Sequence, residues 1–196
     1  MPNTVPDRIT DSVIHVGIVF ALVLANYLLS TPATVMLDDD GYFILAAYFN
    51  GVAHEPGYPL YTVLAHIATW LPFGTVAWRV HALSGLFGAL ACACLWLLAY
   101  RLIQDKLYAH IAAFAFAFSR TFWSQSIIAE VYSLNVLLFF LLLLLCVAHT
   151  QSSGTGGDRG RPERLAFLYG LSLTNHWPLM ILSTPALIAT LWTRLG

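Results

Sequence analysis

Asp38, Asp39 and Asp40 form the densest group of acidic side chains in the sequence, and they follow its first apolar segment. A carboxylate can take the proton from a hydroxyl as that oxygen attacks the anomeric carbon of a sugar. A cation can neutralise the phosphate that leaves, and Arg79 and Arg120 are candidates for this role. These residue types suit glycosyl transfer from a sugar phosphate, with the choice among the three aspartates open. The alternative is that the acidic run only ends a membrane span and is solvated.

Other polar residues stand at the edges of apolar segments, and Glu130 and His176 are the clearest cases. Polar groups at membrane depth cost several kcal/mol unless they are paired or solvated, so these two residues indicate a polar cavity. Aromatic side chains beside the acids can stack on a sugar or a prenyl chain, although interfacial aromatics are also common without a ligand. The aromatic candidates are Tyr42, Tyr58, Tyr61 and Trp123.

Three aspartates also raise the question of a metal ion, because Mg²⁺ and Mn²⁺ prefer oxygen ligands. Adjacent residues of an extended chain point in alternating directions, so at most two of the three readily face one ion. We therefore expect no obligatory metal or other cofactor, and a divalent cation stays an alternative to the arginine.

The composition indicates which class of protein holds these residues. Of the 196 residues, 59% are hydrophobic and 10% are charged, and the mean hydropathy is +0.73. Soluble domains carry roughly 25% charged residues, so we predict an integral, multi-pass membrane protein. The net charge of −1 offers no basic surface for nucleic acid. The three cysteines lie in apolar runs and give neither a disulfide framework nor metal-ligand spacing.

The apolar segments predict an all-α, polytopic membrane domain over residues 1–196. The five expected spans are residues 12–31, 80–102, 107–118, 127–149 and 165–192, the last interrupted at "TNHWP". A cleavable signal peptide is the alternative for the first span, but its length and weakly basic start favour a retained helix. Residues 150–164 are rich in Gly and Ser and predict a flexible inner loop. We expect the chain to be a fragment or a minimal version of a longer enzyme.

Two short apolar pieces, residues 42–53 and 59–71, lie between the first two spans. Each is too short to cross a roughly 30 Å hydrocarbon layer, so we expect re-entrant or interfacial helices in an outer loop at 38–79. Basic residues set the orientation, because cytoplasmic loops carry more Lys and Arg. With the N-terminus inside, the inner segments hold Arg8, Arg101, Lys106, Arg159, Arg161 and Arg164, and the outer ones hold Arg79 and Arg120. The aspartates, "HEPGY" and "AEVY" then share the extracytoplasmic or lumenal face.

Four motifs, taken in order, resemble a known family: "DDDGYFILAAYFNGVAHEPGYPLYTVLA", "LPFGTVAWRVHALSGLFGAL", "FSRTFWSQSIIAEVYSLNVLL" and "LYGLSLTNHW". They are similar to the N-terminal membrane domain of the protein O-mannosyltransferase-like family, glycosyltransferase family 117, over roughly residues 10–185. The resemblance implies a GT-C type fold. It also implies an enzyme that takes a sugar from a polyprenyl-phosphate donor on the outer or lumenal side.

The resemblance distinguishes among the three aspartates. The family commonly has Asp-Ser-Gly-Glu in this loop, and Asp39 falls on the family aspartate, which makes it the favoured base. Asp40 replaces the serine, and Tyr42 stands where the family has its glutamate. The second acidic group is therefore in question, and Asp38 or Asp40 is a candidate to supply it.

The other motifs imply substrate-binding residues. In the family's His-Pro-Pro-Gly-Tyr-Pro stretch, His54 and Tyr58 match, while Glu55 replaces a proline and is a further candidate for the missing acid. Arg120 stands where the family often has a proline, so Arg79 is the favoured phosphate ligand. The remaining matches are Arg79 in "WRV", Glu130 and Tyr132 in "AEVY", and Asn175 and His176 in an "NH" pair.

The predicted function is a membrane glycosyltransferase, GT-C type and inverting, that moves mannose or another hexose from a lipid-linked donor. The acceptor is a hydroxyl on a protein, such as Ser or Thr, or on a glycan. One alternative is a secondary transporter or ion-coupled permease, in which Glu130, His176 and the aspartates form an ion path. It predicts paired broken helices, and the sequence offers one convincing break. Another is a non-catalytic membrane remnant or accessory subunit.

Overall fold

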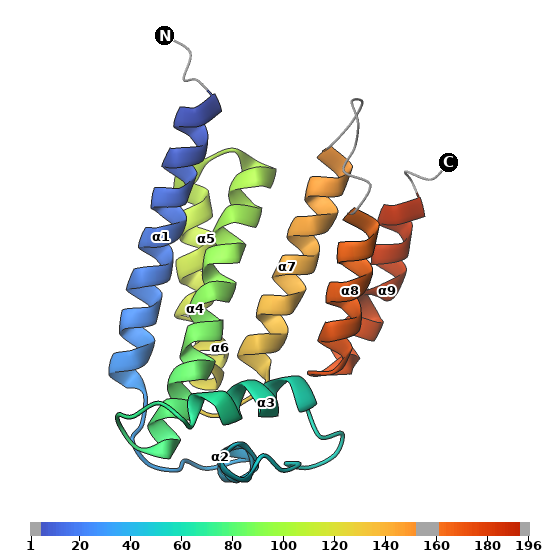
Figure 1. Cartoon of the computed structure of the whole chain (residues 1–196). Helices are drawn as coiled ribbons and strands as arrows, with labels where there is room; N and C mark the ends of the chain where they lie inside the picture. The colour runs from blue at the N-terminus through green and yellow to red at the C-terminus, as the bar shows by residue number, and fades with distance from the viewer. Residues whose placement is uncertain (1–4, 152–160, 193–196) are drawn as a thin grey trace.

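Every described element of the chain is an α-helix (Figure 1). The computed structural model describes residues 5–151 and 161–192, and within these ranges it has nine helices and no strand. The helices are α1 Val5–Ser30, α2 Asp40–Phe49, α3 Pro59–Ala68, α4 Val76–Ile103, α5 Lys106–Ala117, α6 Arg120–Ser126, α7 Tyr132–Gln151, α8 Arg161–Leu173 and α9 Trp177–Trp192. The all-α prediction is confirmed.

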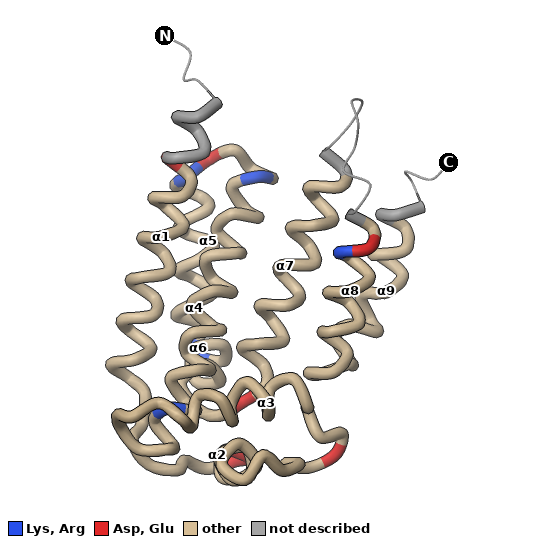
Figure 2. Tube along the Cα trace, in the orientation of Figure 1, with Lys and Arg blue, Asp and Glu red and all other residues tan. Residues whose placement is uncertain are grey.

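Three helices are long and apolar enough to cross a membrane by length and composition. The qualifying segments are Asp11–Ser30 of α1, Val76–Ile103, which is α4, and Tyr132–His149 of α7. Helix α4 is central, because it packs against α1, α5 and α7. Charged residues lie at the two ends of the bundle and leave its middle apolar (Figure 2). This distribution is the one expected of helices whose middle lies in hydrocarbon.

Small residues let α4 approach its neighbours closely. A Cβ atom on Gly88 would lie 2.7 Å from Ser126 Oγ and 2.8 Å from Tyr27 Cε2, so α6 and α1 leave no room for a side chain there. Tyr27 also donates its hydroxyl to the Ala117 carbonyl at 2.8 Å, which joins α1 to the end of α5. Close backbone approach through small residues is a common way of packing helices in lipid.

The segment between α5 and α7 differs from the prediction made from the sequence. The sequence predicts a span at 127–149, whereas α7 begins at Tyr132 and the short helix α6 precedes it. Residues 127–131 are not helical, and the Ala129 amide donates to the side chain of Asp40 instead of to a helical carbonyl. The break at "TNHWP" lies where the sequence predicts it, but it separates two helices, α8 and α9, that pack against each other.

The segment between α1 and α4 holds α2 and α3, which lie across the lower end of the long helices (Figure 1). They occupy the two segments for which the sequence predicts short interfacial helices. Pro59 begins α3, where the N–H that proline lacks would have no partner inside the helix. The loop therefore covers the end of the bundle at which α1 ends and α4 and α7 begin.

Candidate functional site

Asp40 is the buried point at which three parts of the chain meet. Its side chain is 0% exposed, and its Oδ1 accepts the Ala129 amide at 2.7 Å and lies 2.7 Å from His81 Nε2. Its Oδ2 accepts the Met36 amide at 2.6 Å. Burial alone would raise the pKa of Asp40, but the hydrogen bonds from His81 and the two amides outweigh it and lower the pKa. Asp40 therefore joins α2, α4 and the segment before α7 as a buried carboxylate.

This junction brings Asp39 close to Glu130. Asp40 is bonded to the Ala129 amide, Asp39 directly precedes Asp40 in the chain, and Glu130 directly follows Ala129. The Asp39 side chain is 54% exposed, and its Oδ2 lies 3.3 Å from His54 Nε2, within ion-pair distance but outside hydrogen-bond geometry. The other ring nitrogen of His54, Nδ1, faces the Glu55 carbonyl at 2.9 Å, which fixes the ring orientation. An accessible carboxylate is thus held beside an imidazole.

Glu130 is buried, with 6% of the residue exposed. Burial, followed by the nearby charge of Asp39, raises the pKa of Glu130 from 4.5 to about 7. The two neighbouring acids thus differ in environment. Asp39 is exposed, whereas Glu130 is buried and has a pKa near neutral pH.

Aromatic rings border these two acids. The Tyr58 ring stacks on His176 with centroids 6.0 Å apart, and it meets His54 at 5.2 Å. The Tyr132 ring meets His176 edge-on at 5.5 Å. His176 Nδ1 is buried with no hydrogen-bond partner in residues 5–151 and 161–192, and burial lowers the pKa of this histidine. A neutral imidazole with an unpaired nitrogen therefore stands among rings that can stack on a sugar face.

Backbone and amide contacts hold the turn between α8 and α9 against this cluster. Asn175 Nδ2 donates to the Val131 carbonyl at 3.1 Å, and the Leu60 amide donates to the Thr174 carbonyl at 3.4 Å. Asn175 Oδ1 is buried without a partner. In the "NH" pair, the side-chain amide of Asn175 thus holds Val131 in place, and His176 contributes its ring to the aromatic cluster.

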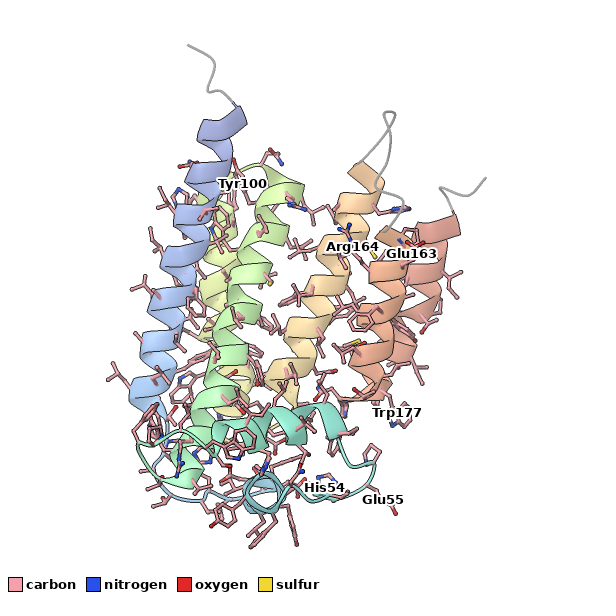
Figure 3. All side chains as sticks on the ribbon, in the orientation of Figure 1. His54, Glu55, Tyr100, Glu163, Arg164 and Trp177 are labelled. Atoms are coloured by element: carbon pink, nitrogen blue, oxygen red, sulfur yellow. The ribbon has the colours of Figure 1, made fainter. Side chains whose placement is uncertain are left out.

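The structure brings together six of the residues named from the sequence, while the side chains of Glu55 and Asp38 are exposed. The six are Asp39, His54, Tyr58, Glu130, Tyr132 and His176. Glu55 is exposed, and its side chain points away from the helices (Figure 3). Asp38 is exposed and has a left-handed backbone, with φ of 65°.

Arg79 is engaged with backbone carbonyls. Its guanidinium Nη1 donates to the carbonyls of Thr69 and Leu71, and Nε donates to the Thr75 carbonyl at 3.2 Å. Arg79 thereby holds the end of α3 against the start of α4. The expected role of Arg79 as phosphate ligand stays a prediction. To bind a phosphate, its guanidinium would have to give up hydrogen bonds to these backbone carbonyls.

No side-chain pattern in the sequence indicates the contribution of Ala129, because the group that acts is its backbone amide. Among the described residues no group of three or more His, Cys, Asp or Glu is arranged to hold a metal ion. The expectation about metals stays a prediction.

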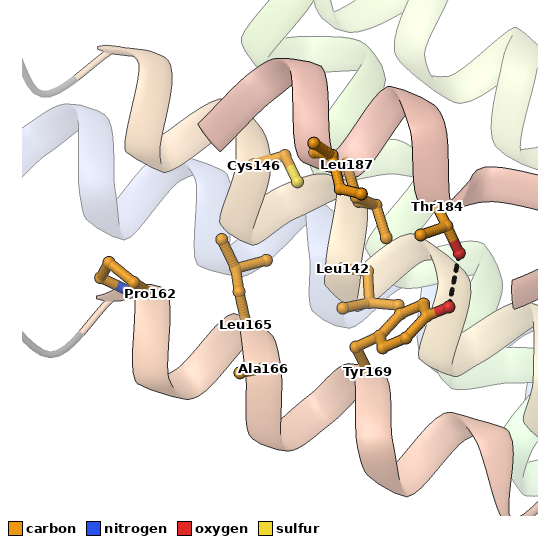
Figure 4. Close-up of a pocket in the computed structure, with 9 residues that line it drawn as sticks. Leu142, Cys146, Pro162, Leu165, Ala166, Tyr169, Thr184 and Leu187 are labelled. Carbon is orange, nitrogen blue, oxygen red and sulfur yellow. Dashed lines mark hydrogen bonds between the residues drawn. The ribbon is translucent and has the colours of Figure 1, made fainter. Parts of the chain in front are cut away.

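A separate apolar cavity of about 210 Å³ lies between α7, α8 and α9, and residues such as Leu142, Leu165 and Leu187 line it (Figure 4). The hydroxyls of Tyr169 and Thr184 hydrogen-bond to each other beside it.

Comparison with known proteins identifies relatives for most of the chain. A family model, the protein O-mannosyl-transferase TMEM260 N-terminal domain, matches residues 39–195. The chain is 42% identical over 165 residues to the mouse protein O-mannosyl-transferase TMEM260, covering 83% of this chain and 23% of that protein. It is 31% identical over 171 residues to the Dictyostelium discoideum protein O-mannosyl-transferase tmem260, covering 81% and 21%. The chain thus spans about a quarter of the length of these relatives. No solved structure matches it.

Proposed function

Because this chain belongs to the protein O-mannosyl-transferase TMEM260 N-terminal domain family, we propose that it carries the sugar-transfer site of a membrane glycosyltransferase. The observation that carries the proposal is the pairing of an accessible carboxylate, Asp39, with a buried one, Glu130, beside the rings of Tyr58 and His176. Two carboxyl groups in different environments can hold different protonation states at one pH, which acid–base chemistry requires.

In the proposed reaction the acceptor hydroxyl attacks the anomeric carbon of the sugar from the face opposite the phosphate, which is displaced in the same step. The new bond joins the acceptor oxygen to that carbon, and the bond from the carbon to the phosphate oxygen breaks. Asp39 takes the hydroxyl proton, and the lipid phosphate leaves with the bonding electron pair. The configuration at the anomeric carbon inverts. His54 orients the Asp39 carboxylate, because its Nε2 lies 3.3 Å from Asp39 Oδ2.

The remaining side chains of the cluster bind the sugar in this proposal. Tyr58 and Tyr132 offer ring faces, and His176 Nδ1 offers a buried nitrogen that has no hydrogen-bond partner among the described residues. Glu130, whose pKa burial raises to about 7, can donate to a sugar oxygen when protonated and accept from a sugar hydroxyl when ionised. Asp40 holds the two acids in place and contacts no substrate.

The finer features of the proposal follow from the family resemblance and the charge distribution. The donor is a polyprenyl-phosphate mannose or related hexose, the acceptor is a hydroxyl of a protein, and the architecture is of the GT-C type. The excess of basic residues in the predicted inner segments supports an extracytoplasmic or lumenal site. The site residues lie at the end of the bundle that α2 and α3 cover (Figure 1), which agrees with one catalytic face.

The test is transfer of labelled mannose from polyprenyl-phosphate mannose to acceptor peptides by the purified protein. Asp39→Asn is expected to lower the transfer rate by about a hundredfold or more, because general bases contribute about 10²–10⁴-fold. Glu55→Gln is the matched control, since it removes an exposed acid from the same loop. Full activity of the correctly inserted Asp39→Asn protein would refute the role of Asp39.

A further inference from the structure

His81 lies near the start of α4, and its imidazole is fully buried between two hydrogen-bond acceptors. Its Nε2 lies 2.7 Å from Asp40 Oδ1, and its Nδ1 lies 3.0 Å from the carbonyl oxygen of Pro32. A carbonyl oxygen carries no proton and can only accept. The Nδ1 atom of His81 must therefore hold a proton in order to make this hydrogen bond.

The Asp40 carboxylate requires a proton on the other nitrogen of the ring. Asp40 Oδ1 accepts the Ala129 amide at 2.7 Å, and Oδ2 accepts the Met36 amide at 2.6 Å. Hydrogen bonds donated to a carboxyl group favour its ionised form, and an ionised carboxylate can only accept. Nε2 of His81 is then a donor as well. Only the imidazolium cation can donate from both ring nitrogens.

No other cation balances the buried charge of Asp40. Within residues 5–151 and 161–192, His81 is the basic side chain that lies within ion-pair distance of Asp40. Arg79, two positions earlier on α4, donates instead to the carbonyls of three other residues. A buried carboxylate is costly unless it is paired and hydrogen-bonded. The positive charge of His81 therefore offsets the negative charge of Asp40.

The same part of α4 also supports the second acid of the site. Ser84 follows His81 by three residues, so the two side chains lie on one face of the helix. Ser84 Oγ lies 2.8 Å from the Tyr61 hydroxyl, and it donates to the Glu130 carbonyl at 3.5 Å. This face of α4 thus holds the start of α2 through His81 and the segment before α7 through Ser84.

The charge on His81 keeps Asp40 in the junction. Removing the partner of a buried ion pair is strongly destabilising, because it leaves an uncompensated charge. Without its cation, the Asp40 carboxylate can regain hydration only by leaving the junction. This movement would shift Asp39, which precedes it, and would release the Ala129 amide next to Glu130. Both acids of the site would then lose their positions.

We propose that His81 is a buried imidazolium cation and a positioning residue, which holds Asp39 and Glu130 in place through the Asp40 carboxylate. The inference rests on the proposed function, because these two acids form the site proposed there. His81 is fully buried and contacts no substrate. Its loss should therefore lower the turnover and leave the KM for the donor unchanged.

Nitrogen NMR tests the charge without relying on activity. The full chain, labelled with nitrogen-15 in its histidine rings, is measured in nanodiscs at pH 7. The signals that disappear in His81→Gln identify the ring of His81, and both are expected to be those of protonated nitrogens. His110→Gln is the matched control. His110 faces the Lys106 carbonyl through Nδ1 at 2.7 Å, and its signals should be mainly those of a neutral ring.

A second variant keeps the NMR test decisive if His81→Gln does not insert. Asp40→Asn removes the carboxylate charge that holds the second proton on the ring. The two protonated nitrogens of His81 in the native protein should then become one protonated and one unprotonated nitrogen.

Hydrogen exchange and kinetics test the positioning. In His81→Gln the amides of residues 127–131 should exchange about tenfold faster or more, because the hydrogen bond from the Ala129 amide to a charged group is lost. The turnover of mannose transfer should fall about tenfold to a hundredfold, since a displacement of about 1 Å can cost about a hundredfold. The KM for the donor should stay within about twofold. His110→Gln should change none of these quantities.

Three results would overturn the inference: an unprotonated nitrogen in the native His81 ring at pH 7, native exchange and turnover in His81→Gln, or a raised KM with unchanged turnover. If the native protein transfers no mannose, then the proposed function fails. The ring signals and the exchange rates still decide in that case whether His81 is charged and holds the two acids in place.

Discussion

Glu130 gives the sharpest test of the site geometry, because its ionisation links the environment of the site to protein stability. The pKa of Glu130 rises from 4.5 to about 7 through burial and the charge of Asp39. Below pH 4.5 the residue is protonated in both the folded and the unfolded chain. Between pH 4.5 and about 7 the unfolded chain releases the proton while the folded one retains it, so stability falls as the pH rises. Above about pH 7 this loss of stability is complete and no longer changes with pH.

The size of this loss follows from the shift. One pKa unit corresponds to about 1.4 kcal/mol, so the shift corresponds to a loss of about 3 kcal/mol above pH 7. Glu130→Gln cannot ionise and should be more stable than the native protein by about that amount at pH 8 and by little at pH 4. Heat unfolding of the detergent-solubilised protein, followed by tryptophan fluorescence between pH 4 and 8, measures the difference.

Two controls make the reasoning refutable. Glu55→Gln removes an exposed carboxylate of the same loop and should leave the pH dependence of unfolding unchanged. Asp39→Asn removes the second cause of the shift, so it should move the pH window of Glu130 to lower values. If the native protein and Glu130→Gln lose stability in parallel across pH 4.5–7, then Glu130 does not carry the raised pKa and the acids are not adjacent.

The remaining predictions concern the packing that places the site. Asp40→Asn should lower the free energy of unfolding by about 1–3 kcal/mol, because one end of the amide is a donor and cannot accept the hydrogen bonds that both carboxylate oxygens accept. Thermal unfolding measures this, and a stability equal to that of the native protein contradicts the junction. Gly88→Ala should cost about 1–3 kcal/mol, since its Cβ would overlap Ser126 and Tyr27. Gly17→Ala, which has open space around its Cβ, is the matched control, and an equal effect of both substitutions contradicts the packing argument.

The sequence predicted the members of the cluster better than their separate roles. The order of the motifs brought His54, Tyr58, Glu130 and His176 into one site, and these residues do lie together. The difference between Asp39 and Asp40 was not readable from the residues alone, because it depends on which of the two faces His81 and the Ala129 amide. An aspartate is chemically the same at both positions, and only the start of α2 decides which is buried.

Arg79 and Arg120 show the limit of the motif match more directly. A matching context favoured Arg79 as the phosphate ligand, yet its guanidinium donates to the carbonyls that follow α3. Such contacts involve backbone carbonyls, and the pattern of residue types in a sequence does not show where these carbonyls will lie. The span expected at 127–149 failed at its start for the same reason, since the Ala129 amide is needed outside the helix.

The location of buried polar groups also bears on the transporter alternative. An ion path requires polar groups that continue through the membrane region. In α7 the buried polar residues Ser133 and Asn135 lie within the first turn, and the buried residues that follow, from Leu137 to Cys146, are apolar. The polar region of α7 therefore stops near the end of the bundle that α2 and α3 cover. A polar site confined to one face can bind and transfer a sugar there. Along the described part of α7 the buried polar groups do not continue across, and this arrangement favours catalysis over transport.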